Sequence, residues 1–208
     1  MPEASAGHAI HEEHHDPVAA RMGMWLFLFT EAILFGVFFI VYAVYLRLYP
    51  WDFRAGSRLL DRFMGAGNTV ILLTSSLTMA LAIAALERGR KGLSNLMGAA
   101  TILCALGFLV VKGFEWSHKF HHGYVPRSPE VLRWPPGQQV FLSLYYCMTG
   151  LHALHVLLGM AMIGWALWVV SRRAEAERNA TLLGNVGLYW HLVDLVWIFL
   201  FPLFYLIG

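Results

Sequence analysis

Long unbroken runs of apolar residues, separated by short polar segments, dominate the sequence. Each run is rich in Leu, Phe and Ala, and a helix of about 20 such residues crosses a hydrocarbon core of about 30 Å. Five runs are long enough: 22–46, 66–86, 93–114, 140–170 and 182–207. Strands of a membrane β-barrel would instead alternate apolar and polar residues. The pattern therefore predicts an all-α fold, a polytopic membrane bundle of five transmembrane helices.

The polar segments between the runs contain residues that end helices. Pro and Gly recur in them, and the segment 115–139 alone holds four prolines, Pro126, Pro129, Pro135 and Pro136. We find no internal repeat and no loop long enough for a soluble domain. The sequence thus divides into a polar tail, 1–21, and a five-helix transmembrane domain, 22–208. The tail carries His8, His11, His14 and His15, which could bind a metal or respond to pH, although a plain polar arm is the simpler interpretation.

Composition narrows the class of protein. Of the 208 residues, 58% are hydrophobic and only 13% are charged, against about 25% charged in ordinary globular domains. A soluble domain of this size could not bury so much apolar surface, and a disordered chain would carry far less of it. The net charge is +2 with scattered basic residues, which argues against binding to nucleic acid. Cys104 and Cys147 lie in apolar runs and form no C-x-x-C or haem-attachment motif.

Charge gives a weak indication of orientation. Seven Lys and Arg residues lie on the N-terminal side of the bundle and eight on the other, which is close to a tie. The two shortest loops, 87–92 and 171–179, carry three each, and dense positive charge in short loops favours the cytoplasm. We therefore expect the N-terminus in the cytoplasm and, after five helices, the C-terminus outside.

Glu31 is the most conspicuous polar residue within a run. It lies nine residues into the first run, so about 14 Å deep at a rise of about 1.5 Å per residue. Its neighbours on the same helical face are all apolar: Phe27, Leu28, Leu34 and Phe35. Because hydrocarbon disfavours a charged carboxylate, we expect a neutral, hydrogen-bonded carboxyl or a group linked to proton transfer. The sequence leaves both alternatives open.

The fourth and fifth runs contain three histidines and an aspartate. His152 and His155 are spaced i, i+3, as are His191 and Asp194, so each pair shares a helical face. Such a set could bind a metal or haem, or it could be a hydrogen-bond network that couples the two helices. We favour the network, because no paired Glu-x-x-His motif is present and two imidazoles one turn apart cannot hold one haem from both faces.

The end of the third run carries alternating charges. Lys112, Glu115 and Lys119 follow i, i+3, i+7 and can pair along one helical face. The simpler alternative, which we prefer from sequence, is a solvated helix end with a lysine that extends to the interface. The candidate functional residues, as proton-linked groups or members of a buried polar network, are therefore Glu31, Glu115, His152, His155, His191 and Asp194.

Several of these segments together resemble subunit III of the haem-copper terminal oxidases, the cytochrome c oxidase type. The similar segments are GMWLFLFTE at 23–31, NTVILLTSS at 68–76, KGFEW at 112–116, TGLHALHV at 149–156 and YWHLVDLVW at 189–197. Their order and spacing agree with the family over roughly residues 23–206. Longer members have seven helices, and the chain resembles shorter, five-helix bacterial forms. In the long form, the first two helices help to enclose a lipid-filled cleft, so we hypothesise that a partner, such as an extended subunit I, supplies that wall here.

The resemblance implies a role without a redox centre. It implies an accessory subunit of a proton-pumping oxidase in a bacterial inner membrane, packed on subunit I, in contact with subunit II, other oxidase subunits and phospholipid. It would sustain proton uptake and protect subunit I during turnover. No cofactor is expected in this chain, while haem and copper belong to subunits I and II. It also implies a cytoplasmic N-terminus and places Glu115 near the outer interface. Cytochrome c oxidase is the favoured type and quinol oxidase the alternative.

Two functions of other classes remain open from sequence. A haem-b electron carrier could use the membrane histidines as ligands. A secondary transporter could use Glu31 as its proton site, although the sequence lacks the inverted repeat and interrupted helices common in such proteins.

Overall fold

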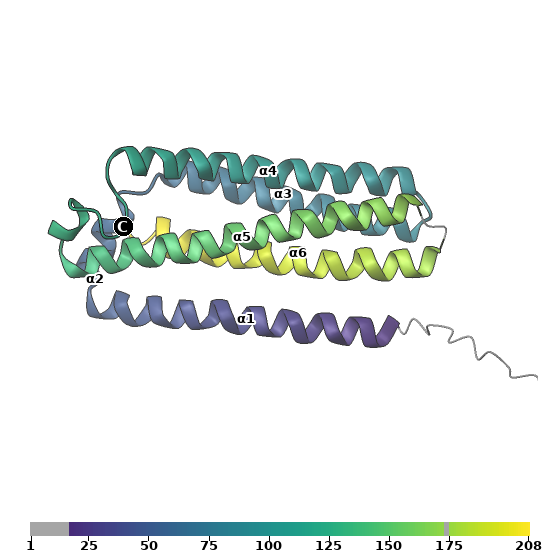
Figure 1. The fold of residues 1–208 in the computed structure, drawn as a ribbon, viewed down its shortest axis with the longest axis horizontal. Helices are drawn as coiled ribbons and strands as arrows, with labels where there is room; N and C mark the ends of the chain where they lie inside the picture. Colours follow the sequence, from purple (N-terminus) through teal and green to yellow (C-terminus); the bar gives the residue numbers. More distant parts are fainter. Residues whose placement is uncertain (1–16, 173–174) are drawn as a thin grey trace, which may run out of the picture.

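The computed structural model describes residues 17–172 and 175–208. It contains five long helices: α1 (Pro17–Leu48), α3 (Arg62–Glu87), α4 (Lys91–His121), α5 (Pro136–Arg172) and α6 (Ala176–Tyr205) (Figure 1). All five are long and apolar enough to cross a membrane. Each overlaps one predicted run, so the prediction of an all-α, five-helix membrane bundle is confirmed.

Two short helices occupy segments that the sequence indicated as loops. These are α2 (Pro50–Ser57) and a 3₁₀ helix at Val131–Arg133. Pro50 occupies the first turn of α2, where its missing N–H costs nothing. Phe53 then points inward and is fully buried, with its ring against those of Tyr42 and Phe141. Packing of this one aromatic side chain therefore stabilises a helix that was not predicted.

The helix boundaries also differ from the prediction at the N-terminus. The first helix begins at Pro17 rather than near residue 22, so residues 17–21 of the expected tail are helical. His8, His11, His14 and His15 lie outside the described residues. The apolar run that sequence indicates is thus only the central part of a longer helix.

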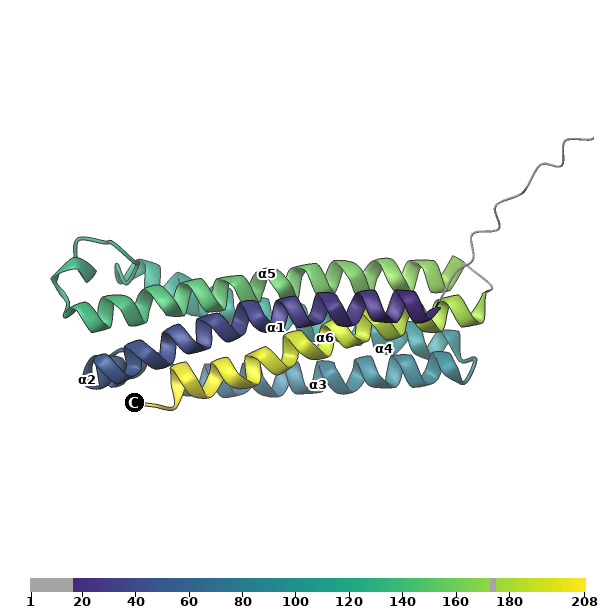
Figure 2. The same cartoon turned by 90° about the horizontal axis from the view of Figure 1, so that it is seen from below.

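The helices form an antiparallel bundle in which α1 is peripheral. The α3–α4 hairpin packs against α5 and α6, while α1 runs along α5 and α6 on the other side (Figure 2). α2, the α4–α5 connection and the C-terminus lie at one end of the bundle. The turns α3–α4 and α5–α6 lie at the other end, together with the start of α1 (Figure 1).

The core is inside the bundle and the outer faces are apolar, as hydrocarbon requires. Small residues allow helices to approach closely, for example where Gly159 of α5 meets the ring of Trp190 of α6. Outward-facing residues of α1, such as Trp25, Phe29 and Ile33, are at least half exposed. The polar side chains within the bundle therefore need an explanation, because lipid tails cannot form hydrogen bonds with them.

Candidate functional site: buried polar clusters of the bundle

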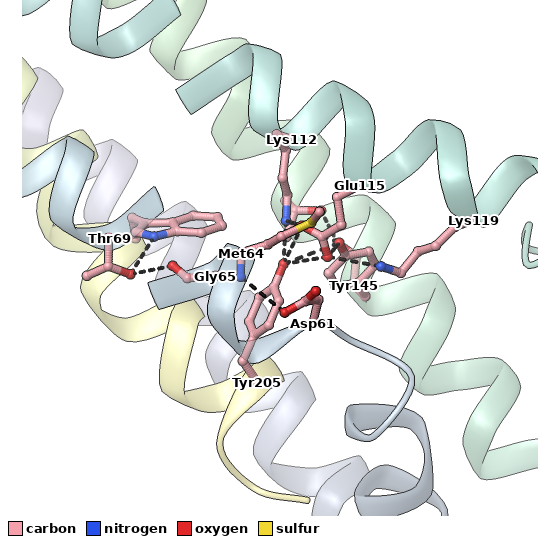
Figure 3. Close-up of polar contacts among 11 residues, drawn as sticks. Asp61, Met64, Gly65, Thr69, Lys112, Glu115, Lys119, Tyr145 and Tyr205 are labelled. Atoms are coloured by element: carbon pink, nitrogen blue, oxygen red, sulfur yellow. Dashed lines mark hydrogen bonds and ion pairs between the residues drawn. The ribbon is translucent and has the colours of Figure 1, made fainter. Parts of the chain in front are cut away.

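A cluster of charged side chains lies at the end of the bundle where α4 ends. Glu115 accepts hydrogen bonds from the ammonium groups of Lys112, at 3.0 Å, and Lys119, at 2.9 Å. The phenol groups of Tyr145 from α5 and Tyr205 from α6 donate to the same carboxylate at 2.7 and 2.8 Å (Figure 3). We call these five residues the Lys112–Lys119 cluster, and it joins three helices through one carboxylate.

Aromatic rings help to stabilise the charge of Lys112. Its ammonium lies 4.9 Å from the ring centre of Tyr145, 5.0 Å from that of Trp197 and 5.2 Å from that of Tyr205. It also donates hydrogen bonds to both phenol oxygens. The tyrosines therefore act on this cation chiefly through their hydroxyl oxygens, while the Trp197 ring attracts it through its negative quadrupole, most strongly where water is excluded.

Burial decides between the two sequence interpretations of this segment. Lys112, Glu115 and Lys119 are 3%, 4% and 5% exposed. The interpretation preferred from sequence, a solvated helix end, is therefore wrong, and the pairing that was left as the alternative is present. The reason is tertiary: α5 and α6 cover this face of α4 and bring the two tyrosines to it.

Glu31 pairs with His155 across α1 and α5. The carboxylate oxygen Oε2 lies 2.8 Å from Nε2 of the imidazole, and the two side chains are 17% and 9% exposed. The other ring nitrogen, Nδ1, donates to the backbone carbonyl of Leu151 at 2.8 Å. Nε2 must therefore either accept a proton from a neutral Glu31 or donate one to an ionised Glu31. In both forms the pair is neutral overall and shares one proton.

His155 has a different partner from the one expected. The sequence interpretation coupled it to the fifth transmembrane helix, whereas its side chain bonds to Glu31 of the first. His155 still contacts α6 through Tyr189, whose hydroxyl donates to the His155 backbone carbonyl at 3.2 Å and whose ring stacks on the imidazole at 6.4 Å between ring centres. The partner of Glu31 could not be assigned from sequence because it lies 124 positions away.

His191 also forms its hydrogen bond with a helix other than the expected one. Its Nδ1 lies 2.7 Å from the Ser76 hydroxyl of α3. The adjacent Trp190 donates its indole N–H to the hydroxyl of Ser75 on the same helix, at 3.1 Å. His191 therefore couples α6 to α3, rather than to α5 as expected.

His152 and Asp194 are buried without a hydrogen bond. They are 0% and 3% exposed, and within residues 17–172 and 175–208 neither side chain has a hydrogen-bond partner of normal geometry. The ring of His152 packs edge-on against Phe108 and tilted against Trp197. Asp194 lies within reach of the hydroxyls of Ser75 and Ser76.

The four residues expected to form one network therefore do not hydrogen-bond to one another directly. In the described part of the chain, no hydrogen bond joins any two of His152, His155, His191 and Asp194. Nor does any group of three or more His, Cys, Asp or Glu side chains there have the arrangement of a metal site.

The sequence interpretation missed the tyrosines of the Lys112–Lys119 cluster. Tyr145 and Tyr205 lie in apolar runs, and a buried phenol hydroxyl generally requires a partner. That requirement was a usable signal, but it does not specify which charged residue the hydroxyl meets. Ser75 and Ser76 of α3, which were not among the candidate residues, are the partners of Trp190 and His191.

Comparison with known proteins places this arrangement in a family. Residues 4–208, which include all five long helices, match the sequence model of cytochrome c oxidase subunit III. The chain belongs to this family. The resemblance noted from sequence motifs is thus confirmed, and the chain is a multi-pass membrane protein of the haem-copper oxidase subunit III family.

Relatives of this subunit III serve oxidases of more than one type. It is 29% identical to cytochrome bo(3) ubiquinol oxidase subunit 3 of Pseudomonas putida, with 90% of this chain and 85% of the relative aligned. It is 33% identical to cytochrome c oxidase subunit 3 of Alkalihalophilus pseudofirmus, over 90% and 86%. A haem-copper oxidase subunit I+III of Aeropyrum pernix is 33% identical over 90% of this chain and 22% of that longer protein. Membership implies association with other oxidase subunits.

Proposed function

We propose that this subunit III is the non-catalytic accessory subunit of a proton-pumping haem-copper terminal oxidase in a bacterial inner membrane. It stabilises subunit I and supports proton uptake during aerobic respiration. The observation that carries the proposal is the family match over residues 4–208. The buried ionisable groups fit this role, because the Glu31–His155 pair and the Lys112–Lys119 cluster connect helices of the bundle to one another.

The proposed partners are the subunits that would carry out the redox chemistry of the complex. Haem and copper would be held by subunits I and II, and this chain would contact subunit I directly, as well as phospholipid. The I+III relative supports the contact, because its name joins the two subunits in one protein. The N-terminus would lie in the cytoplasm and the C-terminus outside.

We propose cytochrome c as the electron donor of the complex, with a quinol as the alternative. The relatives include both types, so subunit III alone supports either. Oxygen consumption by the purified complex with reduced cytochrome c, and then with a ubiquinol, tests the assignment. A copper-binding Cys pair in the co-purified subunit II agrees with cytochrome c, while its absence together with quinol oxidation contradicts it.

The accessory role is tested by removing the subunit from the complex. We expect the complex without this chain to keep its haem and copper spectrum, since those groups lie in its partners, but to lose activity several-fold faster during turnover. Oxygen uptake is followed to inactivation in both preparations, and re-addition of the chain is the control. An unchanged lifetime would refute the role, and a lost haem spectrum would refute the placement of the cofactors.

A further inference from the structure

Two histidines lie side by side at the C-terminal end of α4, apart from the buried clusters: His118 in the last turn and His122 as the C-cap residue. His118 and His122 are spaced i, i+4, and their ring centres are 4.4 Å apart. Both side chains are exposed, as is His121 between them. A spacing of four residues puts the two imidazoles about 40° apart around the helix axis, whereas His121 lies about 60° from His118 and about 100° from His122.

A hydrogen bond fixes the protonation of one ring. Nδ1 of His122 lies 2.8 Å from the backbone carbonyl oxygen of His118. A carbonyl only accepts, so Nδ1 carries the proton, and the neutral ring keeps its lone pair on Nε2. Metal-binding histidines are commonly held in this way, with the second ring nitrogen donating to a carbonyl or carboxylate.

The surroundings suit a cation with water as its remaining ligands. His118 and His122 line a cavity of about 770 Å³, together with Asp61. Asp61 caps α3 through Oδ1, which accepts from the backbone N–H of Phe63. The nearby Lys119 ammonium is paired with Glu115. No group of three protein ligands occurs in the described ranges, so this chain would supply two nitrogens.

We propose that His118 and His122 form a two-histidine chelate for a divalent transition-metal ion of the Cu²⁺ or Zn²⁺ class. Paired imidazoles at i, i+4 on a helix are an established arrangement for such ions. Ca²⁺ and Mg²⁺ prefer oxygen ligands and are not expected to compete. Binding would clamp the last turn of α4 beside the Lys112–Lys119 cluster. The inference does not rest on the oxidase assignment, because it uses only these two side chains.

Copper titration of the full chain tests the proposal. The histidines at 8, 11, 14 and 15 are first replaced by Gln, because they could bind Cu²⁺ independently. In that background we expect one Cu²⁺ per chain by equilibrium dialysis, with an electron paramagnetic resonance spectrum of imidazole nitrogen ligation. Lowering the pH should release the ion, since protons compete for the same nitrogen lone pairs.

Two variants and a matched control make the test specific. H118Q and H122Q should each abolish binding of the single Cu²⁺. H121Q, which changes the exposed residue between them, should retain it. Circular dichroism confirms that each variant is folded, which their exposed positions favour. The proposal is overturned if no Cu²⁺ binds, if H118Q binds as the parent does, or if H121Q also abolishes binding.

Discussion

Two lysines share one glutamate in a part of the bundle where all three side chains are buried from solvent. Removing charges from water is costly, and the attraction between them compensates only when the geometry is good and the remaining hydrogen bonds are satisfied. The Lys112–Lys119 cluster meets this condition because Tyr145 and Tyr205 both donate to the Glu115 carboxylate. The Glu115 carboxylate is therefore the group to which the other four side chains of the cluster donate hydrogen bonds.

We expect E115Q to be the most destabilising conservative substitution in the Lys112–Lys119 cluster. It leaves two buried ammonium groups without their counter-ion, and breaking a buried pair costs about 3–5 kcal/mol. K119Q is the matched control, since Lys112 and Glu115 remain paired one to one. Unfolding of the chain in detergent, followed by circular dichroism, should give a clearly lower midpoint for E115Q than for K119Q. Equal midpoints would contradict the central role of the carboxylate.

The sequence identified the polar residues that matter better than it identified their partners. Glu31, Glu115 and His155 were selected because a charge or imidazole within an apolar run is costly, and that cost can be read from local composition. Their contacts depend on which helices pack together, and on their rotation. For this reason the Glu31–His155 pair and the part played by Tyr205 became evident only from the structure.

Helices of this bundle approach one another through small residues, and Gly159 marks one such close approach between α5 and α6. A Cβ atom there would lie 2.7 Å from the Trp190 ring. The ring cannot easily move, because its N–H donates to Ser75 of α3. We expect G159A to cost about 1–3 kcal/mol of stability, as overpacking in cores does.

Gly164 on the same helix provides the control for this prediction. A Cβ atom at Gly164 would meet nothing within 4 Å, so G164A should not lower the unfolding midpoint in detergent. A loss in G164A as large as that in G159A would show that the effect comes from helix flexibility instead of the contact with Trp190.

The peripheral helix α1 is joined to α5 by the Glu31–His155 pair. We expect a double-mutant cycle of E31A and H155A to give a coupling energy of about 1 kcal/mol, in the range of hydrogen bonds measured inside membranes. A cycle of E31A and H191A is the matched control, because His191 hydrogen-bonds to Ser76 of α3 and not to α1. That second cycle should be additive within about 0.5 kcal/mol. Coupling of equal size in both cycles would contradict a direct bond between α1 and α5.

The long helices were predictable because each depends on the composition of its own segment. A run of about 20 apolar residues has few alternatives to a helix in lipid, since every backbone polar group must be satisfied within the segment. The eight-residue α2 is different. Its sequence contains Pro, Gly and charged residues, and its helix depends on Phe53 packing against rings of α1 and α5, which the local pattern does not reveal.

For the molecule as a whole, the proposed orientation assigns each end of the bundle to one side of the membrane. The loop between α3 and α4 is short and strongly basic, whereas the α4–α5 connection is longer and rich in Pro. Positive charge in short loops is retained on the cytoplasmic side. The Lys112–Lys119 cluster and the proposed His118–His122 chelate would then face the outside, and the start of α1 the cytoplasm.

Labelling of single cysteines in intact cells tests this orientation. Cys104 and Cys147 are first replaced by Ala, and then R133C and R88C are made separately, at two exposed positions. Because Arg133 precedes α5 and Arg88 follows α3, the two positions lie at opposite ends of the bundle (Figure 1). A membrane-impermeant thiol reagent should modify R133C in intact cells and R88C only after lysis. The reverse pattern would place the N-terminus outside, and with it would move the proposed metal chelate to the cytoplasmic side, where a different pool of copper and zinc would reach it.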